Sequence, residues 1–200
     1  IGVDDLIATA TSAIREAPNG EQVLARIEFE CRIRLQVLSG EDEARITMLA
    51  VRRWLGWSAG EILLFDIGGG SFEIAQGADE YPDVSLSVPL GAGRTTVNFL
   101  SEDPPPREAV SRLRAHARQV FTEARETMFL DRPAPTRVVG TSKTIRSLGR
   151  LIGGPANPVT GELAPLHYTG LREWEPTLRE MPGSVREYLP GITPERGYQI

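Results

Sequence analysis

The chain has 200 residues, of which 40% are hydrophobic and 24% charged, a composition typical of a globular protein with one core or two small ones. Its net charge of −5 argues against broad nucleic-acid binding, which usually needs a basic excess. No apolar run approaches the roughly 20 residues of a membrane helix, so we expect no membrane association and a cytoplasmic location. Cys31 is the only cysteine, which excludes a disulfide within this sequence, and its apolar neighbours predict a buried position.

The first quarter of the chain alternates between expected strands and helices. Apolar spacing predicts a short strand over residues 6–10, a helix over 21–31 and a strand over 33–37. Ser39 is suited to cap the next helix, because Asp42 follows three residues later as in a capping box. The residues of this helix and its end that we expect to be buried are Ile46, Leu49, Ala50, Trp54 and Trp57.

The rest of the chain predicts a strand meander followed by helices. Strands are expected over residues 62–67, 72–76, 84–89 and 137–140, with a turn at 91–94. A long helix over 107–128 follows three prolines and carries solvated arginines at 112, 114, 118 and 125. Another helix begins after Thr141 or Ser142 and ends at Gly154. We expect a loop over 155–170, helical pieces beyond it, and a helix start at 193–195.

The stretch from Asp66 to Glu73 has the composition of a phosphate and metal site. Its loop consists of Gly68, Gly69, Gly70 and Ser71. Glycines let backbone N–H groups approach an anion without intervening side chains, and the serine adds a hydroxyl donor. The two bracketing carboxylates are hard oxygen ligands, suited to a magnesium ion that also holds phosphate oxygens. A glycine-rich hairpin with solvated acids is the alternative, and the bracketing acids favour the phosphate site.

The residues after the loop exclude the commoner phosphate-binding motifs. Dinucleotide fingerprints and Walker loops run into a helix, whereas the alternation of Phe72 and Ile74 predicts a strand and therefore a hairpin. The loop resembles the second phosphate loop of the actin-like phosphotransferase superfamily. Through Glu73 it is most similar to the exopolyphosphatase/guanosine pentaphosphate phosphohydrolase family.

Three further segments resemble the same family, in the family's order. Residues 10–17 resemble a loop whose arginine, here Arg15, lies by the substrate phosphates. Residues 38–45 resemble a signature whose catalytic base matches Glu43. Residues 140–146 resemble the third phosphate loop, in the form found in an arginine-rich bacterial branch of exopolyphosphatases. The positions that match its phosphate-binding residues are Gly140, Thr141, Ser142 and Lys143, the only lysine of the chain.

Each of these residues also has a simpler structural explanation. An acid in a first helical turn, such as Glu43, usually caps the helix and favours its dipole, and the resemblance reverses that preference. Even then, Glu43 is either a true base or a group that orients water. Thr141 and Ser142 could be helix caps, Lys143 could reach solvent, and Arg15 could pair with Glu16 on the surface.

The resemblance implies actin-like α/β domains of the ribonuclease H-like type, each a mixed sheet flanked by helices. Residues 1–46 would end the first domain and 47–200 would form most of the second. It also implies a homodimeric enzyme that uses Mg²⁺, or Mn²⁺ in its place, to release phosphate from inorganic polyphosphate. Guanosine pentaphosphate or tetraphosphate is the alternative ligand. The family's first phosphate loop, Asp-x-Gly-Ser/Thr-x-Ser, is absent from this sequence, so we expect a truncated chain with half of the phosphate cradle.

Two other function classes stay open from the sequence. One is a non-catalytic regulator that binds polyphosphate or guanosine tetraphosphate through the same loops without turnover. The other is an ATP-dependent kinase on the same scaffold, which Glu43 disfavours because the resembling hydrolases have their base at that position.

Overall fold

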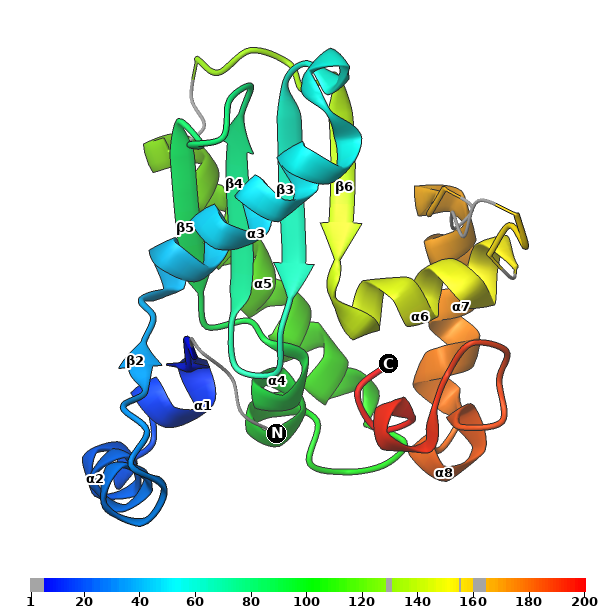
Figure 1. Ribbon diagram of the computed structural model, residues 1–200. Coiled ribbons are helices and arrows are strands. Elements are labelled where there is room, and N and C mark those ends of the chain that lie inside the picture. The colour runs from blue at the N-terminus through cyan, green and yellow to red at the C-terminus, as the bar shows by residue number, and fades with distance from the viewer. Residues whose placement is uncertain (1–5, 129–130, 155, 160–164) are drawn as a thin grey trace.

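A computed structural model describes residues 6–128, 131–154, 156–159 and 165–200, which contain two sheets (Figure 1). The smaller sheet pairs β1 (Thr9–Ala10) with β2 (Gln36–Val37) in parallel. The larger sheet has four strands in the order β5-β4-β3-β6. Its strands are β3 (Ile62–Ile67), β4 (Phe72–Gly77), β5 (Val84–Val88) and β6 (Arg137–Thr141). Because β3 to β5 are antiparallel and β6 runs parallel to β3, the predicted mixed sheet is confirmed.

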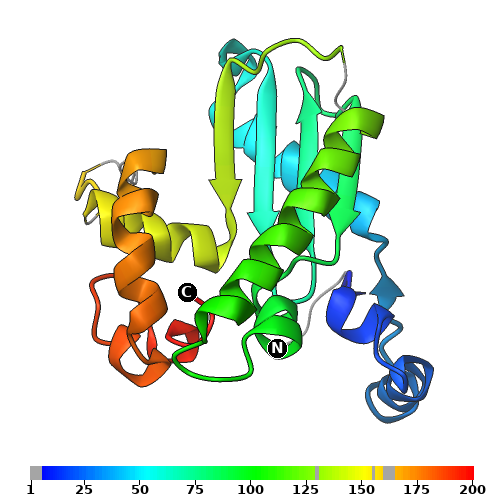
Figure 2. The same cartoon turned by 180° about the vertical axis from the view of Figure 1, so that it is seen from behind.

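Helices cover both faces of the larger sheet. The helix α3 (Gly40–Leu55) crosses one face, and α5 (Arg107–Met128) crosses the other (Figures 1 and 2). The other helices are α1 (Ser12–Arg15), α2 (Gly20–Cys31), α4 (Ala92–Phe99), α6 (Ser142–Gly153), α7 (Tyr168–Glu180) and α8 (Gly183–Arg186), with 3₁₀ turns η1 (Trp57–Ala59) and η2 (Pro194–Arg196). Among the described residues, no helix is both long and apolar enough to cross a membrane.

The alternation of side chains along β3 divides the core into two layers. Ile62 and Leu64 pack with Met48 of α3 on one face of the sheet. Leu63 and Phe65 point to the opposite face, where Phe72 of β4 and Ala117 and Val120 of α5 belong to the same apolar layer. Since successive strand residues face opposite sides, the next even position, Asp66, belongs to the α3 face. The site is therefore a continuation of the first core layer.

The predicted cap of α3 is confirmed, but its predicted buried stripe is wrong. The Ser39 hydroxyl accepts a hydrogen bond from the Asp42 N–H at 3.1 Å. Ile46 and Ala50, however, are exposed, and the buried residues are Ala44, Met48, Val51 and Arg52. Both stripes have helical spacing, so the pattern alone could not choose between them. The contact of Gly40 with β5 fixes the rotation of the helix instead.

Three residues expected in the core are exposed. Trp54 is 84% exposed and Trp57 is 67% exposed, because α3 ends there. Cys31 is exposed at the end of α2, which packs chiefly against the short helix α1. Apolar residue type predicted burial correctly only where a sheet face was available to receive the side chain.

The remaining predicted elements differ mainly at their ends. The strands expected over 6–10 and 33–37 contract to two residues each, and the turn expected at 91–94 is instead the start of α4. The long helix over 107–128 and the strands over 62–67 and 72–76 are confirmed. Part of the loop expected over 155–170 lies outside the described residues, and α7 begins inside that range. A domain boundary near residue 46 stays a prediction, and α3 is continuous through that point.

A buried arginine ties the far end of α3 to the sheet. The Arg52 side chain is 1% exposed. Its guanidinium donates to the carbonyls of Gly60 at 2.6 Å, Gly77 at 3.2 Å and Gly56 at 3.4 Å. These carbonyls come from the end of α3, the approach to β3 and the end of β4, so one side chain satisfies acceptors from three segments.

We expect Arg52→Met to lower the free energy of unfolding by about 2 kcal/mol, because the apolar stem is kept while buried carbonyls lose their donor. Urea denaturation of the full-length protein measures this loss. The neighbouring Arg53→Met is the matched control: Arg53 is exposed and pairs with Glu80, so its loss should cost less than about 0.5 kcal/mol. Equal stabilities of the two variants would contradict a structural role for Arg52.

Candidate active site

The glycine loop between β3 and β4 is held from one side by the start of α4. The backbone N–H of Ala92 donates to the Gly68 carbonyl, and that of Arg94 donates to the Gly69 carbonyl, each at 2.9 Å. A third loop carbonyl, that of Gly70, accepts a hydrogen bond from the Nε of the Arg94 side chain at 2.7 Å. Three successive carbonyls of the loop are therefore directed toward α4.

This anchoring determines where the N–H groups of the loop point. In a planar trans peptide the N–H lies opposite the C=O, so the N–H groups of Gly69, Gly70 and Ser71 must point away from α4. None of these three finds an acceptor within the described part of the chain. Successive N–H groups pointing the same way form a concave anion site. We call the N–H groups of these three residues the nest.

The anchoring requires glycine at position 91, the residue directly before α4. A Cβ on Gly91 would lie 2.4 Å from both the Gly70 carbonyl carbon and the Ser71 nitrogen. No side chain fits at that separation, and the neighbouring atoms are backbone that cannot turn aside. Gly91 therefore allows the close contact between the start of α4 and the loop.

The two carboxylates that bracket the loop face each other across the hairpin. Asp66 pairs in register with Glu73, and Glu73 pairs with Ser87 of β5, so all three residues lie on the α3 face. Glu73 is 3% exposed, and its Oε1 accepts a hydrogen bond from the Ser87 hydroxyl at 2.9 Å. Burial raises the pKa of Glu73, and the charges of Glu43 and Asp66 raise it further against the hydroxyls of Ser71 and Ser87.

The start of α3 brings Glu43 to this corner. A Cβ on Gly40 would lie 2.2 Å from the Cβ of Ser87, so glycine lets the helix start directly against β5. Glu43 is in the first turn of that helix, with a side chain 16% exposed. Its charge contributes to raising the pKa of Glu73, and the contact of Gly40 with Ser87, which binds Glu73, brings the start of α3 to the same corner.

Arg15 is bound to Glu43. Its Nη1 donates to Glu43 Oε1 and to the Leu38 carbonyl, both at 2.5 Å. Its Nη2 lies 3.7 Å from Glu16, so the surface pair considered from the sequence also forms. The second oxygen of Glu43 has no hydrogen-bond partner in the described ranges.

The third predicted phosphate loop lies at the same edge of the sheet. β6 is parallel to β3, and Thr141 stands beside Asp66 in register, with its hydroxyl donating to the Phe65 carbonyl at 3.4 Å. A Cβ on Gly140 would lie 2.6 Å from Ile145, so glycine lets α6 fold back at this point. Ser142 has a left-handed φ of 78° and accepts a hydrogen bond from the Ile145 N–H, acting as a cap.

Lys143 lines a separate, cationic cavity. This cavity has a volume of about 340 Å³ and lies between α6 and the segment that contains η2. It combines Lys143, Arg146, Arg150 and Arg196 with one acid, Glu195. The charges of Lys143 and Arg196 contribute to lowering the pKa of Glu195, after the larger effect of the Thr193 hydroxyl. The structure therefore does not bring Lys143 into the cavities beside the nest.

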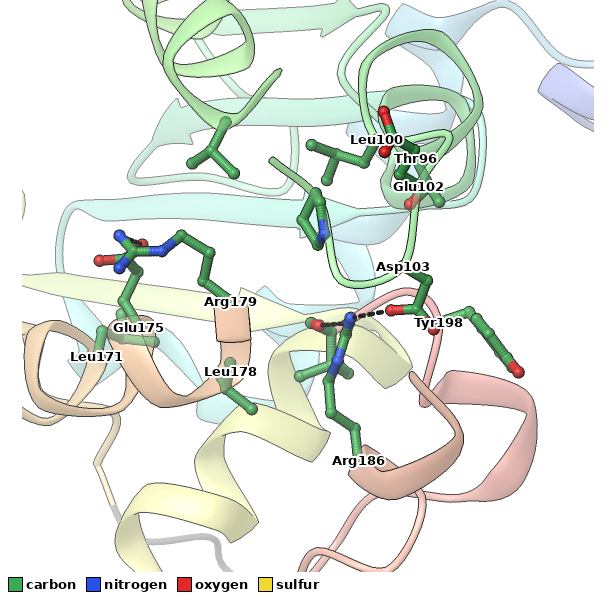
Figure 3. A pocket seen from close by; sticks show the side chains of 13 residues that line it. Thr96, Leu100, Glu102, Asp103, Leu171, Glu175, Leu178, Arg179, Arg186 and Tyr198 are labelled. Carbon is green, nitrogen blue, oxygen red and sulfur yellow. Dashed lines mark hydrogen bonds and ion pairs between the residues drawn. The ribbon is translucent and has the colours of Figure 1, made fainter. Parts of the chain in front are cut away.

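An equally large cavity is mostly apolar. It lies between α4, the start of α5 and α7, and Leu100, Leu171 and Leu178 are among its lining residues (Figure 3). Both of its arginines are neutralised by acids that also line it: Arg186 contacts Asp103 at 3.0 Å and Arg179 contacts Glu175 at 3.5 Å. We assign it no role in phosphate chemistry.

The carboxylates fit a divalent ion that also binds substrate. In the described ranges, no group of three or more His, Cys, Asp or Glu residues is placed to hold a metal ion. Asp66 and Glu73 alone offer hard oxygens on one face, next to the nest. Magnesium typically uses one or two carboxylates and takes its other ligands from waters and phosphate oxygens, so this pair meets its requirements.

Several residues that build the site have no chemical motif of their own. Ser87, Gly40 and Gly91 position the loop, the base and Glu73 by close contact. Ser87 stands opposite Glu73 in the pairing of β4 with β5, a register that the strand ranges alone do not give. The contacts of the two glycines depend on how α3 and α4 pack, which no local pattern reports.

The fold and the site define a class of phosphate-binding α/β proteins, and comparison with known proteins identifies the family. Residues 1–200 match the model of the Ppx/GppA phosphatase family, so the chain belongs to that family. Its fold is the actin-like ATPase type predicted from the sequence. A crystal structure of the Aquifex aeolicus family member aligns with a TM-score of 0.77 at 28% identity, covering 96% of this chain and 61% of that one.

Relatives with assigned names agree with this membership. The chain is 49% identical to Exopolyphosphatase 1 of Mycobacterium leprae and 46% identical to Exopolyphosphatase 1 of Mycobacterium tuberculosis, over its whole length. It spans 59% and 58% of the length of those relatives. A crystal structure of an exopolyphosphatase from Cytophaga hutchinsonii shares the fold, with a TM-score of 0.80 at 22% identity over 96% of this chain and 62% of that one.

Replacing Gly91 with alanine should disturb the nest, because the new Cβ meets backbone atoms of Gly70 and Ser71. We expect Gly91→Ala in the full-length protein to weaken inorganic phosphate binding by about tenfold or more, measured by calorimetry. Gly149→Ala is the matched control, since a Cβ there meets nothing within 4 Å. Unchanged phosphate binding in Gly91→Ala would show that the loop tolerates displacement of α4.

Burial of Glu73 predicts a pH dependence of stability. A carboxyl whose pKa is raised on folding binds its proton more tightly in the folded state, so the wild type gains stability as pH falls and loses it as pH rises through the folded pKa. Glu73→Gln removes this dependence. In metal-free buffer its melting temperature should exceed that of the wild type at pH 8, with a smaller difference at pH 5.

The same melting temperatures are measured again after Mg²⁺ is added. The ion should stabilise the wild type more than Glu73→Gln, because the amide removes one anionic ligand. A melting-temperature difference that is independent of both pH and Mg²⁺ would contradict the assigned environment of Glu73.

Proposed function

We propose that the full-length protein is an exopolyphosphatase that releases terminal phosphate from inorganic polyphosphate. The observation that carries the proposal is the corner formed by the nest, the Asp66–Glu73 pair and Glu43. Phosphoanhydride hydrolysis needs donors for the equatorial oxygens and a carboxylate that places water in line with the breaking bond. This corner offers both in one place.

Each residue has a defined task in the proposed reaction. The N–H groups of Gly69, Gly70 and Ser71 bind oxygens of the terminal phosphate, supported by Thr141 and Ser142 from the third phosphate loop. Asp66 and Glu73 would hold Mg²⁺, or Mn²⁺ in its place, which neutralises charge on the phosphates when bound. Glu43, held at one oxygen by Arg15, takes a proton from water at its other oxygen.

The proposed reaction is a single displacement at the terminal phosphorus. The water oxygen forms a bond to the terminal phosphorus while the bridging P–O bond breaks, and the electron pair of that bond remains on the shortened polyphosphate. The proton lost by water passes to Glu43. The products are inorganic phosphate and a chain one unit shorter.

The cationic cavity supports a polyanionic substrate. A single terminal phosphate would be served by the nest alone, whereas Lys143, Arg146, Arg150 and Arg196 offer charge for phosphates further along a chain. The names of the relatives favour polyphosphate over guanosine pentaphosphate, which is the competing substrate. A cytoplasmic location and a homodimer accompany this proposal as predictions from the family resemblance.

The decisive test is phosphate release by the full-length protein with polyphosphate or guanosine pentaphosphate as substrate. We expect release from polyphosphate with Mg²⁺, and a fall in kcat of about 100-fold or more in Glu43→Gln, which removes the proton acceptor. Glu41→Gln, in the same helical turn and exposed, is the control. Binding of polyphosphate without turnover by the wild type would favour a regulator, and full activity in Glu43→Gln would refute the role of Glu43.

A further inference from the structure

A chain of alternating charges joins the predicted base to the glycine loop. It begins with Glu43 bound to Arg15 at 2.5 Å, and Arg15 lies 3.7 Å from Glu16 Oε1. The other oxygen of Glu16 pairs with Arg94 Nη2. The Nε of Arg94 then donates to the Gly70 carbonyl at 2.7 Å. We call these four side chains the charge chain.

Glu16 is the centre of the charge chain. Its Oε1 faces one arginine and its Oε2 faces the other, so a single carboxylate joins two guanidinium groups. Both guanidinium groups are planar forks, and each has one further nitrogen bound elsewhere: Arg15 Nη1 donates to Glu43 and Leu38, and Arg94 Nε donates to Gly70. Fixing the carboxylate therefore fixes the orientation of both forks.

The charge chain differs from the solvent-exposed ion pairs of the same molecule. The side chains of Arg15 and Arg94 are 23% and 30% exposed, whereas Arg26 and Arg53, in surface pairs, are 76% and 66% exposed. Ion pairs that are partly withdrawn from water interact more strongly and are less screened by salt. The charge chain also connects three helices that are far apart in sequence, α1, α3 and α4, and so it helps to fix their positions relative to one another.

We propose that Glu16 and Arg94 are positioning residues that set the base and the nest relative to each other. This inference rests on the proposed function. Through Arg15, the Glu16–Arg94 pair orients the Glu43 carboxylate that accepts the proton of water. Through the Gly70 carbonyl, Arg94 directs the Ser71 N–H toward phosphate, because the two groups belong to one planar peptide.

The two residues have different predicted kinetic signatures. An amide at position 16 is uncharged and places an NH2 donor against one of the two arginines, so Glu16→Gln should lower kcat by about tenfold with KM within about twofold. Arg94→Met also frees the Gly70 carbonyl, so it should lower kcat and raise KM by about fivefold or more. Arg94→Lys returns a charge to Glu16 but not the fork, and should recover kcat more than KM.

The experiment measures kcat and KM for phosphate release from polyphosphate by the full-length protein, together with the melting temperature of each variant. Arg53→Met is the control for loss of an exposed ion pair away from the site and should match the wild type in both constants. The double variant Glu16→Gln/Arg94→Met should resemble Arg94→Met alone, because both changes break the same chain. Glu16→Asp keeps two carboxylate oxygens and should retain more kcat than Glu16→Gln.

Two results would overturn the proposal. The first is wild-type kcat in Glu16→Gln, and the second is a double variant whose losses in kcat multiply, which would mean that the residues act independently. Failure of the wild type to release phosphate from polyphosphate would instead reject the proposed function on which this inference rests. The two failures are therefore distinguishable in one data set.

Discussion

The planarity of the peptide bond, combined with the anchoring of three carbonyls, is the constraint on which the site depends. Gly68, Gly69 and Gly70 give their carbonyls to the start of α4 and to Arg94, and their following N–H groups are thereby directed the other way. A glycine loop thereby becomes a fixed set of backbone donors. Preorganised donors of this kind need no rearrangement when charge develops on phosphate oxygens.

The carboxylates obtain their positions from the sheet. Pairing across β3, β4 and β5 places Asp66, Glu73 and Ser87 in one row, and the start of α3 lies directly on the end of that row at Ser87. Burial then keeps Glu73 in an environment that disfavours its charge unless a cation is near. The same contacts that complete the hydrophobic layer under α3 thus assemble the acidic side of the site.

Sequence reasoning succeeded where the information is local and failed where it is tertiary. The hairpin, its register and the cap of α3 follow from alternation, glycines and a serine three residues before an acid, all readable along the chain. The rotation of α3, the start of α4 at two glycines and the exposure of Trp54 depend on which surfaces meet. The resemblance located Glu43 and Arg15, but the pairing between them emerges only when α1 and α3 are placed side by side.

The helix α3 connects the proposed base, Glu43 in its first turn, to Arg52 near its far end. Arg52 fastens its far end to three carbonyls, and nine residues separate it from Glu43, roughly 14 Å along the axis. If α3 tilted by about 4° around its attachment at Arg52, Glu43 would move by about 1 Å. A displacement of that size is large enough to weaken the proposed catalysis severely. Small changes in the layer around Met48 can therefore displace the proposed base in a molecule that is still folded, so the packing of this core determines the geometry of the site as well as stability.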